Sequence, residues 1–475
     1  MKSDAPGSFR FLSVAHVSFG IVSHSVEAQV KDRALPSGPN MTSETNHLVV
    51  LFHGLWGNPS HLKQVQDTLL KQHPDLHVLV PKSNSDNSTY DGIEVGGERI
   101  THEIEEKIKE LEAAGTKITR ISIAGYSLGG LVARYTVGLL YKAGVFDHAK
   151  PTNFTTFATP HLGVRTPNSG YRSQIWNVLG SRTLSTSGQQ MFLVDKFRDT
   201  GGPLLSLLAD PNSIFVKGLA MFERKSVYAN TLNDRSVPYY TSALSRIDPF
   251  VDPDAVDVNY LDGQEEDVIL DPSDPVSPRK PTETALAFHE QYFMSQRTRE
   301  SIPFYAVLFS VLPLAVPVFL VNAGVQTYRS AARVRLHESS KLIDLKRYRM
   351  SLLEDGQAAQ DRMVERLASP PVQQQVYLPT PPPEPSTRNT SPASSVTKVA
   401  ASGNEKNDSP WPTLALADEQ FEMIDNLDKC VGFIKYPVHI QKVRHTHAAI
   451  VVRIDKESFK EGRAVLGHWA KEFIV

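Results

Sequence analysis

The pentapeptide GYSLG at residues 125–129 lies between two apolar runs of different periodicity, and it constrains the fold more than any other feature of the chain. The run before it, 117–124, predicts a buried strand, whereas the run after it, 128–142, carries apolar residues at helical spacing and stops at Gly144. Strand, G-x-S-x-G and helix form the context of a nucleophile elbow, in which glycines permit the tight turn that exposes a serine hydroxyl. We therefore interpret Ser127 as a candidate nucleophile, with an ordinary glycine-rich turn as the alternative.

A serine nucleophile needs backbone donors for a developing oxyanion, and the chain offers two candidates. One is the N–H of Leu128, at the start of the predicted helix. The other follows a predicted strand at 47–52, where Gly54 lets the backbone turn so that the Leu55 N–H faces the site. Asn58 then provides an N-cap, with a proline at the first position of the next helix. An ordinary strand–helix loop is the alternative for this segment.

Two later strands are predicted to end at the same edge of the sheet, where loops of α/β proteins line a site. The strand at 153–158 leads to His161, which follows the serine too closely for the order Ser…Asp…His and is interpreted as a residue that shapes the pocket. The strand at 226–230 leads to Asp234, a candidate acid that would hold an imidazole in the correct tautomer. The alternative for this aspartate is an Asx-turn.

The base is expected last in the chain, and four histidines lie in its C-terminal part, 413–475. His447 opens the apolar element 448–452, which could anchor the loop that carries it, and His445 lies close by. The other two are His439 and His468. Spacing alone leaves the choice between His445 and His447 open.

Five short motifs together carry a family resemblance. They are HGLWG, GYSLGG, TPHLG, NDRSVP and HAAI, at residues 53–57, 125–130, 159–163, 233–238 and 447–450. As a set they resemble the putative serine esterase family of α/β-hydrolase lipases, and most of all its fungal lipid-droplet phospholipase branch. The likeness extends over residues ~46–245 and, more thinly, over ~425–475.

The resemblance implies an α/β-hydrolase fold, with a mostly parallel central sheet and helices on both faces. It implies a triad of Ser127, Asp234 and His447, and so favours His447 over His445. It also implies hydrolysis of acyl esters of glycerophospholipids, without a metal and without a cofactor. The chain departs from a compact hydrolase in its long insertions between the acid and the histidine.

Composition is compatible with this interpretation and excludes some other classes. The 475 residues include 50 Lys+Arg and 52 Asp+Glu, so no global charge favours nucleic-acid binding. Cys430 is the single cysteine, which excludes a disulfide framework and suits a reducing compartment. The sequence contains no zinc spacing and no P-loop.

Shifts in composition divide the chain into six segments. They are an N-terminal tail (1–45), a hydrolase core with nucleophile, oxyanion loop and acid (46–245), an acidic flexible insertion (246–300), a hydrophobic membrane-associating segment with a basic helix (301–367), a disordered linker rich in Pro and Ser (368–412), and a C-terminal part of the hydrolase with the histidine (413–475). Within the core, the apolar stretch 164–223 is interpreted either as a cap over the site or as ordinary core helices.

Residues 302–325 contain no charged side chain. An uncharged stretch of this length is long enough to span a bilayer. A single span would place the triad members on opposite sides of the membrane, and Pro313 and Pro317 would kink or break a helix. We therefore predict a proline-centred hairpin or an interfacial helix. The basic stretch 329–349 suits anionic lipid, with a solvated helix as the alternative.

Together these features predict a serine lipase or esterase that hydrolyses glycerophospholipids at a lipid-droplet or membrane surface. It would face the cytosol, on lipid droplets or the endoplasmic reticulum, with possible protein partners through the proline-rich linker. The alternatives within the same chemistry are an acyl-protein thioesterase and a neutral-lipid lipase. The alternative from another class is a non-catalytic, membrane-tethered scaffold.

Overall fold

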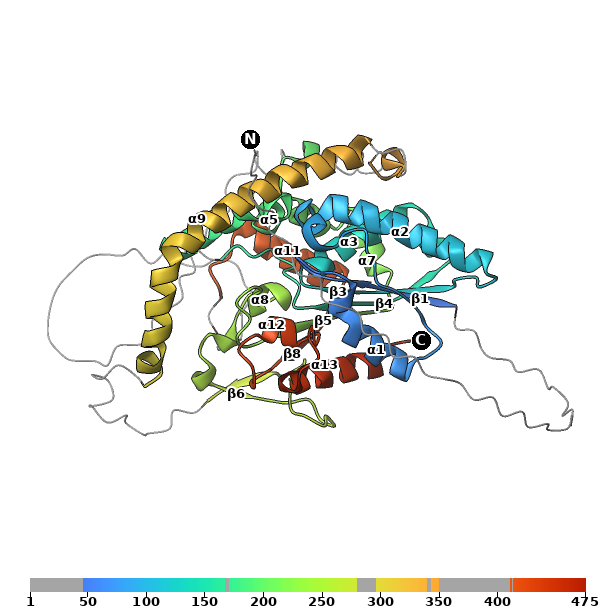
Figure 1. Cartoon of the computed structure of the whole chain (residues 1–475). Helices are drawn as coiled ribbons and strands as arrows, with labels where there is room; N and C mark the ends of the chain where they lie inside the picture. The colour runs from blue at the N-terminus through green and yellow to red at the C-terminus, as the bar shows by residue number, and fades with distance from the viewer. Residues whose placement is uncertain (1–45, 167–170, 280–295, 340–342, 350–410, 412) are drawn as a thin grey trace, which may run out of the picture. The chain divides into compact units, whose positions relative to one another are not determined.

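The computed structural model describes residues 46–475 except 167–170, 280–295, 340–342, 350–410 and 412 (Figure 1). The predicted tail, 1–45, lies outside the described residues, and so does almost all of the predicted linker, 368–412.

Six parallel strands form the central sheet in the order β2-β1-β3-β4-β5-β8. They are β1 (His47–Phe52), β2 (His77–Leu79), β3 (Arg120–Tyr126), β4 (Lys150–Phe157), β5 (Arg224–Asn230) and β8 (Ile434–Val438). The strands predicted from the sequence before and after the nucleophile are confirmed as β1, β3, β4 and β5. Their near-continuous apolar sequences follow from burial on both faces, as expected for a parallel sheet.

Helices cover both faces of this sheet, as predicted (Figure 1). Along β1, Leu48, Val50 and Phe52 pack into the cluster that holds α2 and α3, while Val49 and Leu51 pack into the cluster that holds α1 and α13. This alternation is the two-residue period of a strand. The helices are α1 (Lys63–Gln72), α2 (Ile93–Ala113), α3 (Leu128–Lys142), α6 (Leu204–Leu208), α7 (Ile214–Ala220), α11 (Asp418–Cys430) and α13 (Lys460–Lys471).

Shorter elements connect these layers. They are η1 (Pro59–Leu62), η2 (Asp86–Tyr90), η3 (Val145–Asp147), α4 (Tyr171–Thr183), α5 (Ser185–Met191), η4 (Arg198–Thr200), α8 (Tyr239–Ser242), η5 (Pro249–Val251), η6 (Pro253–Ala255), α12 (Thr446–Ala449) and η7 (Glu457–Phe459). The predicted N-cap at Asn58 is confirmed, because its side chain accepts a hydrogen bond from the Ser60 N–H.

The apolar stretch 164–223 divides between the two interpretations that the sequence left open. Leu204, Leu208 and Phe215, on α6 and α7, are at most 1% exposed and belong to the core. On α4, by contrast, Trp176 and Val178 are 44% and 49% exposed. The stretch is therefore ordinary core at α6 and α7, whereas α4 presents apolar side chains to the surface.

The prediction of a flexible insertion over 246–300 is wrong for residues 247–279. This segment forms a small antiparallel sheet of β6 (Val256–Val258) and β7 (Val276–Pro278). Ile269 is fully buried and bridges Val438 of β8, and the Leu270 N–H donates to the Pro437 carbonyl. The acidic, proline-rich composition concealed the short apolar run that attaches this segment to the edge of the main sheet.

The apolar segment 302–325 belongs to a single helix, α9 (Gln296–Ser339), which continues through both prolines. The hairpin prediction is therefore wrong, and the interfacial helix is left as a prediction. Within the part of the chain that the structure describes, no helix is both long and apolar enough to cross a membrane.

The basic stretch 329–349 is only partly available to a ligand. Arg333 and Arg349 form ion pairs with Asp91 and Glu98 of the hydrolase region. Arg329, Arg335 and Lys346 are exposed to solvent. The alternative of a solvated helix is thus wrong for Arg333 and Arg349, which bind the hydrolase region.

Candidate active site

Ser127 occupies the sharp turn between β3 and α3, with φ 55° and ψ −130°. These angles are sparsely populated by residues other than glycine, and such strain is typical of functional sites. The flanking glycines allow it. A Cβ on Gly125 would lie 2.5 Å from the Gly130 Cα, and one on Gly129 would lie 2.4 Å from the Phe52 carbonyl oxygen. The predicted turn thus has the geometry of a nucleophile elbow.

The structure brings Ser127, His447 and Asp234 into one line of hydrogen bonds. The Nε2 atom of His447 lies 3.0 Å from the Ser127 Oγ, and its Nδ1 atom lies 2.8 Å from an Asp234 carboxylate oxygen. With Nδ1 protonated, the imidazole donates to Asp234 and accepts the serine proton at Nε2. The carboxylate is 2% exposed and the histidine side chain 19%, so the acid end of this line is the more shielded from solvent.

Asp234 combines the two roles that the sequence offered as alternatives. One carboxylate oxygen accepts hydrogen bonds from the Ser236 and Val237 N–H groups, which is an Asx-turn arrangement. The other accepts from the Asn230 amide and faces His447. Burial alone would raise the pKa of this carboxyl, but His447 and these donors outweigh it and lower the pKa below its usual value. The side chain is therefore anionic at neutral pH.

Two contacts hold His447 in place, and His445 is not in the site. The Thr446 hydroxyl donates to the Leu232 carbonyl at 2.7 Å, which ties α12 to the acid loop. The Tyr126 hydroxyl donates to the His447 carbonyl at 2.9 Å. His445 is the exposed N-cap residue of α12, whereas His447 faces the serine. The alternative left open by spacing is resolved by this geometry.

The two predicted oxyanion donors flank the serine. Leu128 is the first residue of α3, so its N–H has no acceptor within the helix. Gly54 backs directly onto the nucleophile, because a Cβ there would lie 2.8 Å from the Ser127 Cβ. The next residue, Leu55, therefore carries its N–H in the loop that borders the serine, and the following Trp56 has a positive φ of 54°.

His161 does not join the triad. It is fully buried, with Nε2 2.8 Å from the Thr156 hydroxyl and Nδ1 facing Arg134. Burial, together with Arg134, lowers the pKa of His161 well below its usual value, so the imidazole is neutral. Its side chain is buried beside β4 and holds that strand through the contact with Thr156.

Sequence reasoning missed two supporting residues, Asn230 and Tyr126. Both lie inside segments that had been interpreted only as strand or motif. The polar side chain at the last position of a buried strand was a usable signal for Asn230, whereas nothing in the sequence pointed from Tyr126 to His447.

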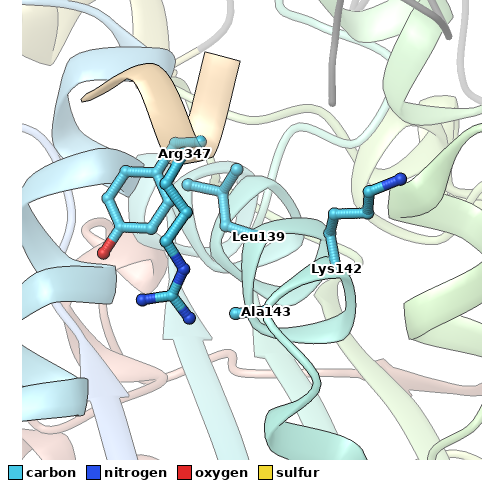
Figure 2. A pocket seen from close by; sticks show the side chains of 5 residues that line it. Leu139, Lys142, Ala143 and Arg347 are labelled. Carbon is cyan, nitrogen blue, oxygen red and sulfur yellow. The ribbon is translucent and has the colours of Figure 1, made fainter. Parts of the chain in front are cut away.

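The pocket shown in Figure 2 does not belong to this site. It is lined by Leu139, Lys142, Ala143, Arg347 and Tyr348. These residues of α3 lie near its C-terminal end, about 20 Å from the serine at 1.5 Å per residue. Among the described residues, no group of three or more His, Cys, Asp or Glu side chains is placed to hold a metal ion.

The parallel sheet, the elbow and the order Ser…Asp…His define an α/β-hydrolase with a serine-hydrolase site. The comparison with protein families narrows this class. Residues 42–245 match the family described as "Putative serine esterase (DUF676)". This region of the chain is thus similar to that family.

Curated relatives match the same part of the chain. The putative lipase ROG1 of Saccharomyces cerevisiae is 32% identical over 222 residues, which are 45% of this chain and 31% of that protein. The putative lipase C4A8.10 of Schizosaccharomyces pombe is 30% identical over 210 residues, or 42% of this chain and 26% of that protein. The chain thus covers less than a third of the length of either relative.

Solved structures show only distant likeness. The phospholipase PlaB from Legionella pneumophila, in complex with thio-NAD, gives a TM-score of 0.27 at 13% identity and covers 41% of this chain and 40% of its own. The RedJ thioesterase from Streptomyces coelicolor gives 0.20 at 16% identity, with 31% and 59% covered. At these TM-scores neither structure carries an argument about activity.

Proposed function

We propose that this protein is a serine lipase or esterase that cleaves acyl esters with Ser127, His447 and Asp234. The observation that carries the proposal is the hydrogen-bonded line of Ser127, His447 and Asp234, at 3.0 and 2.8 Å, on a nucleophile elbow. The family match of residues 42–245 and the relatives named as putative lipases support the same chemistry.

The geometry supports a two-step reaction. Ser127 Oγ attacks the ester carbonyl while its proton passes to His447 Nε2, and the resulting oxyanion is held by the Leu55 and Leu128 N–H groups. His447 then gives the proton to the departing alcohol, which leaves an acyl-serine. In the second step His447 takes a proton from water, and the water oxygen attacks the acyl carbon. The bond to Ser127 Oγ then breaks, the acid leaves, and His447 returns the proton to Ser127. Asp234 holds the imidazole in the required tautomer throughout.

We further propose that the substrate is a glycerophospholipid at a lipid surface, either a droplet monolayer or the cytosolic leaflet of the endoplasmic reticulum. Exposed apolar side chains support a surface that meets lipid. Trp176 on α4 is 44% exposed, and Val318 and Val321 on α9 are 62% and 69% exposed. The exposed Arg329 and Arg335 on the same helix would meet anionic headgroups.

Two rivals share the same residues. An acyl-protein thioesterase or a neutral-lipid lipase would also use the triad, and a panel of phospholipid, triacylglycerol and S-acyl peptide substrates separates them. We expect phospholipid presented on droplets to be cleaved fastest. Faster cleavage of S-acyl peptide or of triacylglycerol would replace the proposed substrate while leaving the serine-hydrolase chemistry in place.

A scaffold without catalysis is the remaining rival, and one reagent separates it from an enzyme. A fluorophosphonate probe reacts with an activated serine and stays attached to it. We expect the wild-type chain to be labelled and Ser127→Ala to remain unlabelled. Absence of labelling in folded wild-type protein contradicts the proposed function.

A further inference from the structure

The oxyanion loop rests on the short helix η2. The Trp56 N–H, next to Leu55, donates to the Thr89 hydroxyl at 3.0 Å. The Asp86 N–H donates to the Gly57 carbonyl at 2.7 Å. These hydrogen bonds fix the backbone on the C-terminal side of Leu55, so the position of the Leu55 N–H depends on where η2 lies.

Thr89 is the central residue of this support. Its hydroxyl accepts from the Trp56 N–H and itself donates to the Asp86 carbonyl at 2.6 Å. Its backbone carbonyl accepts from the Ser187 hydroxyl of α5, also at 2.6 Å. The side chain is 1% exposed, so no solvent competes for these bonds. A change at η2 therefore reaches the oxyanion loop directly.

Helix α9 holds η2 from its other side. The Arg333 guanidinium binds the carboxylate of Asp91, the residue that follows η2, at 2.7–3.0 Å. The same guanidinium donates to the Asn87 carbonyl within η2 at 2.7 Å. Ser330, one turn earlier on α9, adds a 2.7 Å hydrogen bond to Asp91, and Arg99 of α2 adds one of 2.8 Å.

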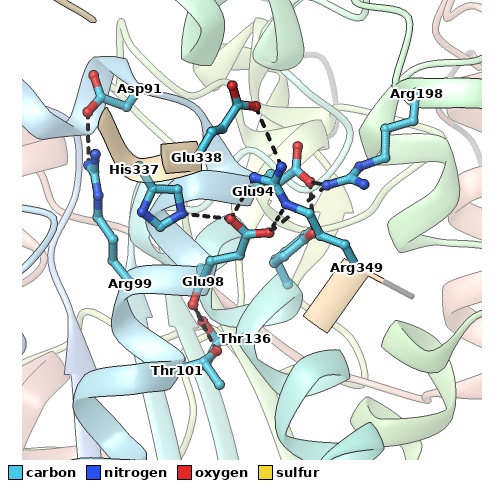
Figure 3. A network of polar contacts seen from close by, with 12 residues as sticks. Asp91, Glu94, Glu98, Arg99, Thr101, Thr136, Arg198, His337, Glu338 and Arg349 are labelled. Atoms are coloured by element: carbon cyan, nitrogen blue, oxygen red, sulfur yellow. Dashed lines mark hydrogen bonds and ion pairs between the residues drawn. The ribbon is translucent and has the colours of Figure 1, made fainter. Parts of the chain in front are cut away.

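The Asp91 side chain is fully buried, and its charge has three partners. A buried ion pair of this kind holds geometry firmly, because loss of one partner leaves an uncompensated charge away from water. A second buried contact lies at Glu98 of α2. His337 of α9, and Arg349 beyond the C-terminal end of α9, each approach the Glu98 carboxylate at 2.8 Å (Figure 3). Helix α9 is thus held at two places along its length, at Asp91 by Arg333 and at Glu98 by His337.

We infer that Arg333 and Asp91 are positioning residues for the oxyanion hole, acting through η2 and Thr89 on the Leu55 N–H. This inference rests on the proposed function, since it concerns the same site. It gives a catalytic consequence to Arg333, which follows Asp234 by about a hundred residues in the sequence. Within the residues that the structure describes, its guanidinium binds Asp91 and Asn87 rather than the serine or the histidine. The helix that carries exposed apolar side chains is then also the outer support of the oxyanion loop.

The test uses the full chain and a short soluble ester, p-nitrophenyl butyrate, so that lipid binding plays no part. Arg333→Gln removes the charge and the forked contact, and Tyr328→Gln changes an exposed side chain of the same helix as the control. Removal of one oxyanion donor costs about 100- to 1,000-fold in kcat, so a displaced donor should cost about 10-fold. We expect that loss for Arg333→Gln, with KM within about twofold, and no loss for the control.

Arg333→Lys should recover part of kcat, because a lysine keeps the charge but lacks the fork. Thr89→Val keeps the shape of the side chain and removes the acceptor of the Trp56 N–H, and it should lower kcat in the same way. The double variant should lose no more than the worse single variant, since both act on one loop. All assays are run well below the measured unfolding temperature.

The inference is overturned if Arg333→Gln and Thr89→Val lower the unfolding temperature but keep the kcat of the control, because the contacts then only stabilise the fold. It is also overturned if the two losses multiply in the double variant. Failure of the proposed function looks different, since folded wild-type protein would then neither hydrolyse the ester nor react with a fluorophosphonate.

Discussion

The sheet core and helix α9 are held in the molecule by different forces. Leu48, Val50 and Leu51 of β1 are fully buried among apolar side chains, and their attachment follows from removal of apolar surface from water. Helix α9 is attached through buried charges instead, by Arg333 on Asp91 and by His337 on Glu98. Arg349, beyond the C-terminal end of α9, pairs with the same Glu98 (Figure 3).

The difference teaches where each part of the molecule is sensitive. Apolar contacts are numerous and non-directional, so loss of one weakens the core in proportion to the surface lost. A buried ion pair depends on both partners, and removal of either costs roughly 3–5 kcal/mol because a charge is left unpaired. The core should therefore tolerate conservative changes, whereas the attachment of α9 should fail at single residues.

The largest effect is expected in the catalytic line that the core supports. Ser127→Ala should reduce hydrolysis by about a million-fold while the unfolding transition stays near that of wild type, because the hydroxyl is the nucleophile and fills little core volume. Steady-state kinetics measure the loss of hydrolysis, and thermal unfolding measures whether the stability is retained. Residual activity within tenfold of wild type contradicts the assignment of the serine.

The next effect distinguishes the two histidines. His447→Ala should fall to the level of Ser127→Ala, and the double variant should lose no more, because triad members act as a unit. His445→Ala, the matched control on the same loop, should retain most activity since its side chain is exposed. An inactive His445→Ala beside an active His447→Ala reverses the assignment of the base.

Asp234→Asn should keep the shape of the acid loop but lose the charge that fixes the imidazole tautomer. We expect kcat to fall about 10,000-fold with the fold retained. Asn230→Ala, which removes only a donor to the same carboxylate, should have a far smaller effect. Equal losses for the two variants would mean that Asp234 acts through the structure of the loop alone.

Glu98 tests the attachment of α9 through acid. Burial raises its pKa, but the hydrogen bonds from His337 and Arg349 outweigh burial and lower the pKa below the usual value. A carboxyl with a lowered pKa in the folded state contributes stability above its unfolded pKa of about 4.3, and this contribution is lost as the pH falls through the folded value. As the pH falls below about 4, we expect the amides of α9 to lose protection from hydrogen exchange before those of the sheet core do.

Glu98→Gln should produce the same loss of protection at neutral pH, since the carboxylate that binds His337 of α9 is gone. Glu112→Gln, at an exposed position of α2, serves as the control. Exchange of α9 and the core in step, in acid and in the variant, would show that the two regions are one cooperative unit, and the comparison drawn above would fail.

The smallest effect concerns lipid. Val321→Asp, at a side chain 69% exposed on α9, should weaken binding to vesicles with anionic headgroups by up to ~3 kcal/mol if the side chain lies at depth. Hydrolysis of a short soluble ester should be unchanged. Vesicle flotation and the ester assay report on the two separately, and unchanged flotation would exclude this face of α9 from the lipid contact.

Much of the hydrolase region could be predicted from the sequence by itself. The strand around 47–52, the elbow at Ser127 and the loop of Asp234 are local patterns, in which the period of apolar residues and the glycines specify the backbone directly. Gly54 and Gly129 mark these turns because no larger residue fits there. A Cβ at Gly54 would meet Ser127, and a Cβ at Gly129 would meet the backbone at Phe52. For these elements the local pattern and the tertiary packing agree.

The family resemblance favoured His447 over His445, but only the tertiary structure shows that His447 faces the serine. The tertiary structure alone decided the course of α9 and the docking of residues 247–279. His447 and Ser127 are 320 residues apart, and Arg333 and Asp91 are 242 apart, so no periodicity links them. In the sequence the basic and acidic residues are separate features. Only the fold shows that the acids are buried and that the two kinds of residue neutralise each other. The physical reason is that a charge is stable in the interior only beside its partner, and that partner is chosen in space rather than along the chain.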